Sequence, residues 1–315
     1  MRVTGMVVAV LAGLVMLGLR VADIGPEWIG GAGSVAVVTG YAWALAARVG
    51  GRPVVAFVLA AVLGTLALVE GGDVMRTGAA VLTCLVSGLL AVMATVPAKG
   101  FPGAVREVAV ALLIASVGAV AVVGFDPVVD RERFDYLTLG LGLAAALVLV
   151  FRLGAGLHGL GRRGIVVVVV GSLLMMLTLA YTQLLRTYGT EGMLEAVVTT
   201  VSWSREHLGA FPRLIVAAVG VPALLWGVHM RARRRQGWWV CAFGVAGTIP
   251  VAQMFTHPAK SYLESVLQSG YGALIGLVIG FALIRLDLML TGGGGGRRAE
   301  EATAIRPEPP RWAAL

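Results

Sequence analysis

The sequence predicts an all-α integral membrane protein with about ten transmembrane helices, and three observations lead to this prediction. Apolar residues make up 58% of the 315 residues and charged residues only 13%, whereas a soluble domain carries roughly 25% charged residues. The apolar residues fall into long runs separated by short polar loops, and basic and acidic residues are divided unequally between alternate loops. With so few charges to cover a water-soluble particle, most of the chain must have lipid as its solvent.

Ten apolar runs are candidate membrane spans. Most approach the length of about 20 residues that a helix rising 1.5 Å per residue needs to cross a hydrocarbon layer of about 30 Å. Because the runs are continuous rather than alternating, helices are favoured over a β-barrel. The predicted spans are 3–19, 28–47, 53–69, 77–98, 108–125, 136–151, 164–185, 214–230, 237–255 and 265–284.

The loop charges predict the orientation of these spans. If all ten are spans, 17 of the 25 basic residues lie on one side of the membrane and 12 of the 17 acidic residues on the other. Cytoplasmic loops are rich in Lys and Arg, so we expect both termini in the cytoplasm and a multi-pass protein of the cell membrane. The first run resembles a secretory signal, but residues 19–23 form a poor cleavage site, which favours an uncleaved first helix.

The chain is expected to form one polytopic transmembrane domain over 1–290, with halves at 1–125 and 136–290. An odd number of spans in each half would invert one half relative to the other, as in many alternating-access transporters. An amphipathic external segment at about 193–210 is predicted to lie flat at the membrane interface. The Gly-, Arg- and Pro-rich sequence of 291–315 predicts a flexible cytoplasmic tail.

In length, span number and orientation this layout is similar to the drug/metabolite transporter superfamily. The similarity concerns the architecture alone, because no motif of that family is present, and no functional residue is carried over. The similarity implies a ten-helix fold built from two inverted halves.

The composition of the spans argues against several functional classes. No Asp, Glu, Lys or Arg lies in the interior of a predicted span, which argues against a proton pump with a buried carboxylate. We assign no catalytic residue, metal site or cofactor, because no HExxH, GxSxG, P-loop or paired haem ligands occur. The basic residues are scattered except at 231–235, so nucleic-acid binding is not expected. Cys84 and Cys241 are predicted to be free thiols, since their expected depths differ by roughly 14 Å.

Uncharged polar residues gather near the outer ends of three predicted spans. If these spans are neighbours, the side chains would line an outward-facing substrate vestibule. The alternative is that each side chain lies singly at the lipid headgroup boundary, as Tyr and Gln readily do. The candidate vestibule residues are Tyr181, Thr182, Gln183, Gln253, Gln268 and Tyr271.

Prolines and glycines predict where the helices bend and pack. Pro222 and Pro250 lie inside predicted spans, where each removes a backbone hydrogen bond and can bend the helix. Gly272, Gly276 and Gly280 form two overlapping GxxxG steps, which allow a neighbouring helix to approach closely. That neighbour belongs either to this chain, to a membrane-protein partner or to a second copy.

Three functions stay open from the sequence. The first is a small secondary transporter or lipid-type flippase for a neutral or amphipathic substrate, favoured by inverted halves without buried charge. The second is a non-catalytic membrane subunit or scaffold of a cell-envelope or transport complex. The third is an interfacial enzyme that uses the loop 186–213, whose titratable residues define no reaction by their spacing; they are Glu191, Glu195, Arg205, Glu206 and His207.

Overall fold

The computed structural model describes residues 3–128, 131–155, 157–233, 236–257, 260–291 and 308–315, and this part of the chain is 81% helical with no strands. The helices in chain order are α1 (Val3–Val21), α2 (Trp28–Arg48), α3 (Pro53–Val69), α4 (Asp73–Met93), α5 (Phe101–Val123), α6 (Arg131–Val150), α7 (Leu157–Tyr188), α8 (Glu191–Leu208), α9 (Val221–Arg231), α10 (Gly237–Ala242), α11 (Val245–Ala252) and α12 (Tyr262–Thr291). Two π-helical segments, η1 (Phe151–Ala155) and η2 (Val216–Gly220), precede α7 and α9.

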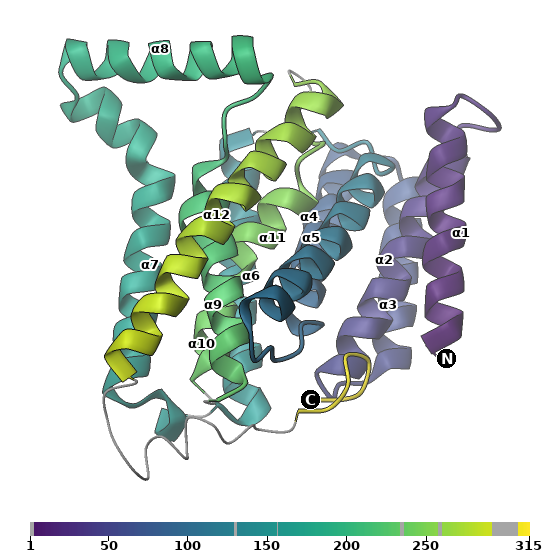
Figure 1. The fold of residues 1–315 in the computed structure, drawn as a ribbon. Helices are drawn as coiled ribbons and strands as arrows, with labels where there is room; N and C mark the ends of the chain where they lie inside the picture. Colours follow the sequence, from purple (N-terminus) through teal and green to yellow (C-terminus); the bar gives the residue numbers. More distant parts are fainter. Residues whose placement is uncertain (1–2, 129–130, 156, 234–235, 258–259, 292–307) are drawn as a thin grey trace.

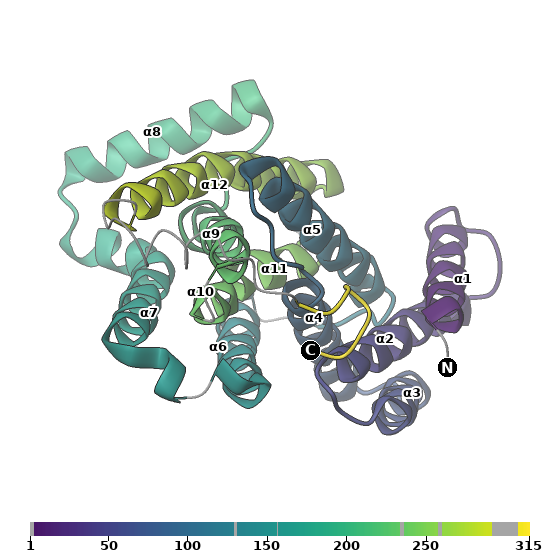
Figure 2. The ribbon, with the colours of Figure 1, turned by 60° about the horizontal axis from the view of Figure 1, so that its bottom comes forward.

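The helices form one bundle, and α8 lies across one of its ends (Figure 1). We call this the α8 end. The described chain begins and finishes at the opposite end, which we call the terminal end (Figure 1). Seen from the terminal end, α1 and α3 lie at one margin of the bundle, α7 lies at the other, and α11 lies between them (Figure 2).

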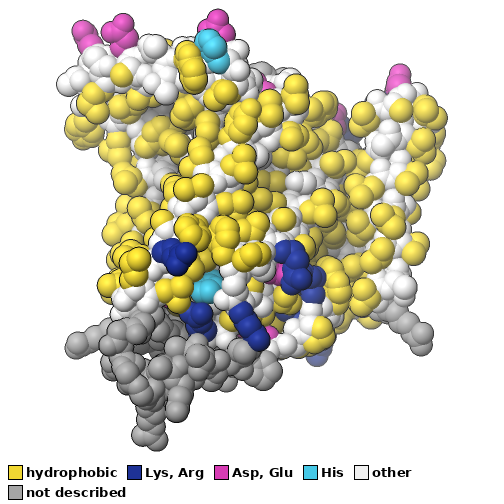
Figure 3. Space-filling model, in the orientation of Figure 1, with side chains coloured by type: hydrophobic (Ala, Val, Ile, Leu, Met, Phe, Trp, Pro, Cys, Tyr) yellow, Lys and Arg dark blue, Asp and Glu magenta, His cyan; other side chains and the backbone are white. Residues whose placement is uncertain are grey.

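Seven helices are long and apolar enough to cross a membrane, and the chain is accordingly a multi-pass membrane protein by length and composition. The stretches 53–69, 216–231 and 237–252 are shorter apolar helices. Less than a fifth of each membrane-length window in α1, α7 and α12 is buried. Apolar surface of this extent is expected where lipid covers it, and it forms a broad band between the two ends (Figure 3).

Each of the ten predicted runs overlaps helical structure, but two of them are not continuous α-helices. The run 214–230 starts with the π turns of η2, and the run 237–255 divides at Phe243 and Gly244 into α10 and α11. The structure also corrects the expectation that no charge lies inside a span. Because Gly100 and Pro102 start α5 at Phe101 rather than at 108, Glu107 lies within that helix and is fully buried.

The structure agrees with the helix predicted near 193–210 but not, over residues 308–315, with the flexible tail predicted at 291–315. Helix α8 covers most of the predicted amphipathic segment 193–210. It ends at Leu208, and the next residue, Gly209, has a positive φ of 77° that terminates the helix. Residues 308–315 were expected to belong to a flexible tail, but they pack on the terminal end. The Leu315 N–H donates to the carbonyl of Arg48, and the Arg48 guanidinium donates to two carbonyls of this segment. Residues 292–307 lie outside the described residues.

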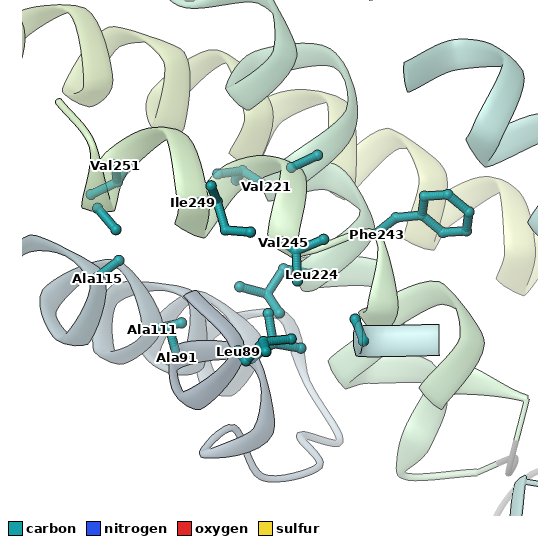
Figure 4. Packing of buried hydrophobic residues seen from close by; sticks show 14 of the residues in the cluster. Leu89, Ala91, Ala111, Ala115, Val221, Leu224, Phe243, Val245, Ile249 and Val251 are labelled. Atoms are coloured by element: carbon teal, nitrogen blue, oxygen red, sulfur yellow. The ribbon is translucent and has the colours of Figure 1, made fainter. Parts of the chain in front are cut away.

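The short helix α11 forms the centre of the hydrophobic core. It is buried along its whole length and contacts α4, α5, α6 and η2. Its Ile249 fills space left by Gly88 and Gly142, since a Cβ on either glycine would collide with the Ile249 side chain. Figure 4 shows Ile249 and Val245 among the side chains of this cluster. Close packing of this kind stabilises membrane helices through dispersion contacts.

Glycines also allow α9 and α12 to approach their neighbours. A Cβ on Gly220 would meet the backbone of Gly247, so η2 and α11 cross at near backbone contact. The three glycines of the predicted GxxxG steps face η2 and α9; a Cβ on Gly276 would lie 2.7 Å from Cβ of Val221. The glycine stripe of α12 is therefore covered within this chain, while Leu274 and Val278 of α12 are exposed.

Replacing Gly276 by leucine should destabilise the bundle, whereas the same change at Gly270 should not. Both glycines lie in α12, so the gain in helix propensity is similar, up to about 1 kcal/mol. At Gly276 the new side chain collides with Val221, whereas nothing lies within 4 Å of a Cβ at Gly270. Overpacking should make Gly276→Leu less stable than Gly270→Leu by about 1–3 kcal/mol, measured by unfolding in detergent. Equal stability of the two variants would contradict this packing.

Candidate functional site

A polar network lies at the α8 end, between α6, α11 and the residues that precede η2. Its members are Asp135 and Thr138 of α6, Gln253 at the end of α11, and Arg213. We call these four residues the α8-end network. Thr138 and Gln253 have no exposed surface, and the side chains of Asp135 and Arg213 are only 20% and 15% exposed. Polar groups buried to this extent require hydrogen-bond partners.

The four side chains bind one another at short distances. Gln253 donates from Nε2 to Oδ1 of Asp135 at 2.8 Å and accepts at Oε1 from the Thr138 hydroxyl at 2.8 Å. Arg213 donates to the other carboxylate oxygen, Oδ2, at 3.0 Å. The amide of Gln253 is therefore fixed by a donor and an acceptor on α6, and the ion pair holds Asp135 toward Arg213.

The end of α11 explains the position of Arg213. The last four carbonyls of a helix have no partner within that helix, and the carbonyl of Pro250 is one of them. Arg213 donates to this carbonyl at 2.8 Å. A cation is also favoured by the partial negative charge at a helix C-terminus. The buried C-terminal end of α11 thus takes its hydrogen-bond donor from Arg213, which lies just before η2 in the chain.

Contacts of α12 extend from this network. The backbone N–H of Arg213 donates to the carbonyl of Gln268 at 3.4 Å, and Lys260 donates to Oε1 of Gln268 at 2.7 Å. The Tyr271 hydroxyl donates to the carbonyl of Leu208 at 2.8 Å. Gln268 therefore borders the α8-end network, while Tyr271 ties α12 to the end of α8.

The structure brings together only part of the predicted vestibule. Gln253 belongs to the α8-end network, and the backbone carbonyl of Gln268 accepts from the backbone N–H of Arg213. Tyr181 instead lines a separate cavity beside α7. Thr182 and Gln183 lie in α7, but their side chains are outside the described part of the structure. The sequence analysis did not assign Asp135 and Arg213 to the site, because each lies in a loop just before an apolar run. Their opposite signs at the ends of two apolar runs were the available signal.

The cavity that contains Tyr181 is apolar and lies beneath α8. Its volume is about 480 Å³. It is lined by the end of α7, by the side of α8 that faces the bundle, and by the segment 211–214, including Leu177, Leu184, Val201, Phe211 and Leu214. Phe211 and Leu214 flank Arg213 in sequence, so the same short segment lines the cavity and supplies the guanidinium of the network.

A second cavity at the α8 end, of about 740 Å³, contains charged and aromatic side chains. It lies between the ends of α1, α2, α3 and α5, beside Phe255 and Tyr262. Arg76 and Asp126 line it and approach each other to 3.7 Å. Phe255 and Tyr262 pack edge to face with centroids 5.2 Å apart. The α8 end thus contains an apolar and a polar cavity, one on each side of the bundle's α11 core.

Other titratable side chains at this end do not converge. Among the described residues no three His, Cys, Asp or Glu side chains are grouped to hold a metal ion. On α8, His207 stacks on Trp203, and Arg205 pairs with Glu264 of α12 at 3.7 Å. Cys84 and Cys241 are buried and free. The α8 end thus has apolar space beside fixed hydrogen-bonding groups.

The α8-end network predicts energetic coupling between Gln253 and Thr138. Gln253→Leu removes the partner of two buried groups and should lower the free energy of unfolding by about 1–3 kcal/mol. Combined with Thr138→Val, the loss should be smaller than additive by about 0.5–3 kcal/mol. Thr39→Val is the matched control, because Thr39 is equally buried on α2 and bonds only within its own helix. Additive losses for Gln253 and Thr138 would refute their hydrogen bond.

The comparisons with known proteins were negative. No protein-family model, curated protein or solved structure matches this chain. The functional conclusion below therefore depends on the geometry of the α8 end and of the helices that lead to it.

Proposed function

We propose that this chain is a small secondary transporter or lipid-type flippase that moves a neutral or amphipathic substrate across the cell membrane. The observation that carries the proposal is the irregular geometry of two helices where they cross in the core, since one contains π turns and the other is interrupted. Helix 216–231 contains the π turns of η2 followed by Pro222, and helix 237–252 is broken before α11. Discontinuous helices form the substrate sites of many transporters, and π turns are frequent at functional sites.

The proposed topology has ten crossings, with the terminal end in the cytoplasm. The three shorter apolar helices would add to the seven of membrane length. On the face shown in Figure 3, Lys and Arg side chains gather toward the terminal end, while most Asp and Glu side chains lie at the α8 end. This distribution supports a cytoplasmic terminal end. Because α11 contacts α4 and α5 as well as α6 and η2, it lies between the proposed halves 1–125 and 136–290.

The substrate class follows from the surroundings of the α8-end network. The apolar cavity beneath α8 offers space for a hydrocarbon portion, and the adjacent amide, hydroxyl and carbonyl groups can orient a polar portion. The carboxylate of Asp135 is already paired with Arg213, which favours a neutral or amphipathic substrate over an ionic one. Helix α8 would lie at the outer membrane interface, where such a molecule enters from lipid.

Filling the cavity should block transport without unfolding the protein. Val201→Trp places a bulky side chain in the cavity, whereas Val198→Trp changes a residue of α8 that is 64% exposed and does not line it. Lipid fractions from the native membrane are first screened for thermal stabilisation of the purified protein. Translocation of the stabilising fraction is then measured in proteoliposomes. Val201→Trp should slow it by about tenfold, equivalent to about 1.4 kcal/mol, and Val198→Trp should leave it unchanged.

The alternative, a non-catalytic subunit or scaffold, gives a different result in the same experiment. In that case no lipid fraction stabilises the protein and the wild-type chain translocates no lipid. Val201→Trp then has no effect on translocation. A partner protein would then co-purify in fixed stoichiometry. Docking through α12 would use its exposed face around Leu274 and Val278, because the glycine face is already covered.

A further inference from the structure

Five charged side chains meet at the terminal end, far from the α8-end network. Arg48 of α2, Glu107 of α5 and Arg231 of α9 are at most 1% exposed. Glu308 and Arg311 reach them from the segment 308–315. We call these five residues the terminal-end cluster. Three guanidinium groups thus lie with two carboxylates in a place where an unpaired charge is costly.

The two carboxylates are committed to particular partners. Glu107 accepts from Arg311 at 2.8 and 2.9 Å and from the Val96 backbone N–H at 3.0 Å. The exposed Arg106, which lies outside the five residues of the cluster, also donates to Glu107, at 3.0 and 3.2 Å. Glu308 accepts from Arg231 at 2.6 Å. Arg231 also donates to the hydroxyl and carbonyl of Thr95, and its guanidinium stacks on Trp238 at 3.5 Å. These contacts fix the plane of the Arg231 guanidinium.

Within the described part of the chain, Arg48 is the guanidinium of this cluster that has no carboxylate partner. It donates to the carbonyls of Met93, Pro310 and Ala313, all of which are neutral. Its second terminal nitrogen, NH2, is buried without a hydrogen-bond partner, and so is Nε of Arg231. Two fixed guanidinium groups with spare donors are suited to an anion that offers several oxygens.

The segment 308–315 supplies such oxygens from the same chain. A carboxylate of Glu308 faces Arg231, and two carbonyls face Arg48. The segment covers these arginines from outside the bundle, since Trp312 within it is 39% exposed while Arg48 and Arg231 are buried. Removal of the segment would uncover both guanidinium groups together and leave them without the oxygens that it provides.

We propose that Arg48 and Arg231 form a phosphate-binding site that residues 308–315 occupy in this structure, with the Glu308 carboxylate in the place of a phosphate oxygen. The ligand is a phosphate group, carried by an anionic lipid headgroup or by a free phosphate compound. A basic cluster at the end of membrane helices is suited to either source. Phosphate and residues 308–315 compete for the same two arginines. A substitution that weakens the binding of the segment to these arginines must therefore strengthen phosphate binding. This site is independent of the proposed transport function.

The test uses the full chain in neutral detergent and the variant Glu308→Gln, which removes the carboxylate charge but keeps the side-chain size. We measure by calorimetry the affinity for inorganic phosphate and for short-chain phosphatidylglycerol added to the micelles, with short-chain phosphatidylcholine, whose headgroup has no net charge, as the reference. Glu308→Gln should bind phosphate groups about tenfold more tightly than wild type. Adding Arg48→Met should abolish the gain. Adding Arg285→Met should not, because Arg285 is exposed near the same end and lies outside the cluster.

Each outcome has a defined meaning. A gain for phosphatidylglycerol alone identifies a lipid headgroup, and a gain for inorganic phosphate as well identifies a site open to free phosphate. An unchanged affinity in Glu308→Gln, or a gain that persists with Arg48→Met, would overturn the site. If Arg48→Met does not fold, Arg48→Lys replaces it. Lysine keeps the charge but loses the planar fork, so less than half of the gain should remain.

Discussion

The cost of leaving a charged group in hydrocarbon is the constraint on which the rest of this structure depends. The charged side chains that enter the bundle lie toward its two ends and have specific partners there. Asp135 pairs with Arg213 at the α8 end, and Glu107 pairs with Arg311 at the terminal end. The centre between these ends is left to small and apolar residues, so that α11 can be buried along its whole length.

The glycine crossing of η2 and α11 connects the two ends mechanically. From Gly220, α9 runs to Arg231 in the terminal-end cluster, whereas from Gly247, α11 runs to Gln253 in the α8-end network. A tilt of either helix about this crossing would therefore move a polar group at one end relative to its partners. Packed helices that shift as units are a common basis of two-state membrane proteins. In the proposed transport function, α9 and α11 would tilt about this crossing.

Much of the helical structure was predictable from the sequence, because helices in lipid require long apolar runs. The run 53–69 is α3 without change, and α8 covers most of the predicted amphipathic segment 193–210. The break between α10 and α11 was not predicted, since Gly244 is one of many glycines in the spans and its neighbours are apolar. Its cause is tertiary: α11 is held in the core by contacts with α4, α5, α6, η2 and α9.

Only part of the candidate site was predictable from the sequence. Gln253 and Gln268 were identified because uncharged polar residues stand out at the ends of apolar runs. The pairing of Asp135 with Arg213 joins residues 78 positions apart, and the Arg48 contact with Pro310 spans 262 positions. No local pattern encodes such pairs. The number of crossings and the orientation also follow from the sequence only as proposals, which the loop charges and the arrangement in Figure 3 support.

The most direct measurement places the two ends of the bundle relative to the membrane. With the buried Cys84 and Cys241 replaced by alanine, a single cysteine is introduced at Trp203 on α8 or at Trp312 in the segment 308–315, both of which are exposed. Intact cells are then treated with a membrane-impermeant maleimide. We expect labelling of Trp203→Cys in intact cells and of Trp312→Cys only after permeabilisation. Labelling of both positions from the same compartment would contradict it.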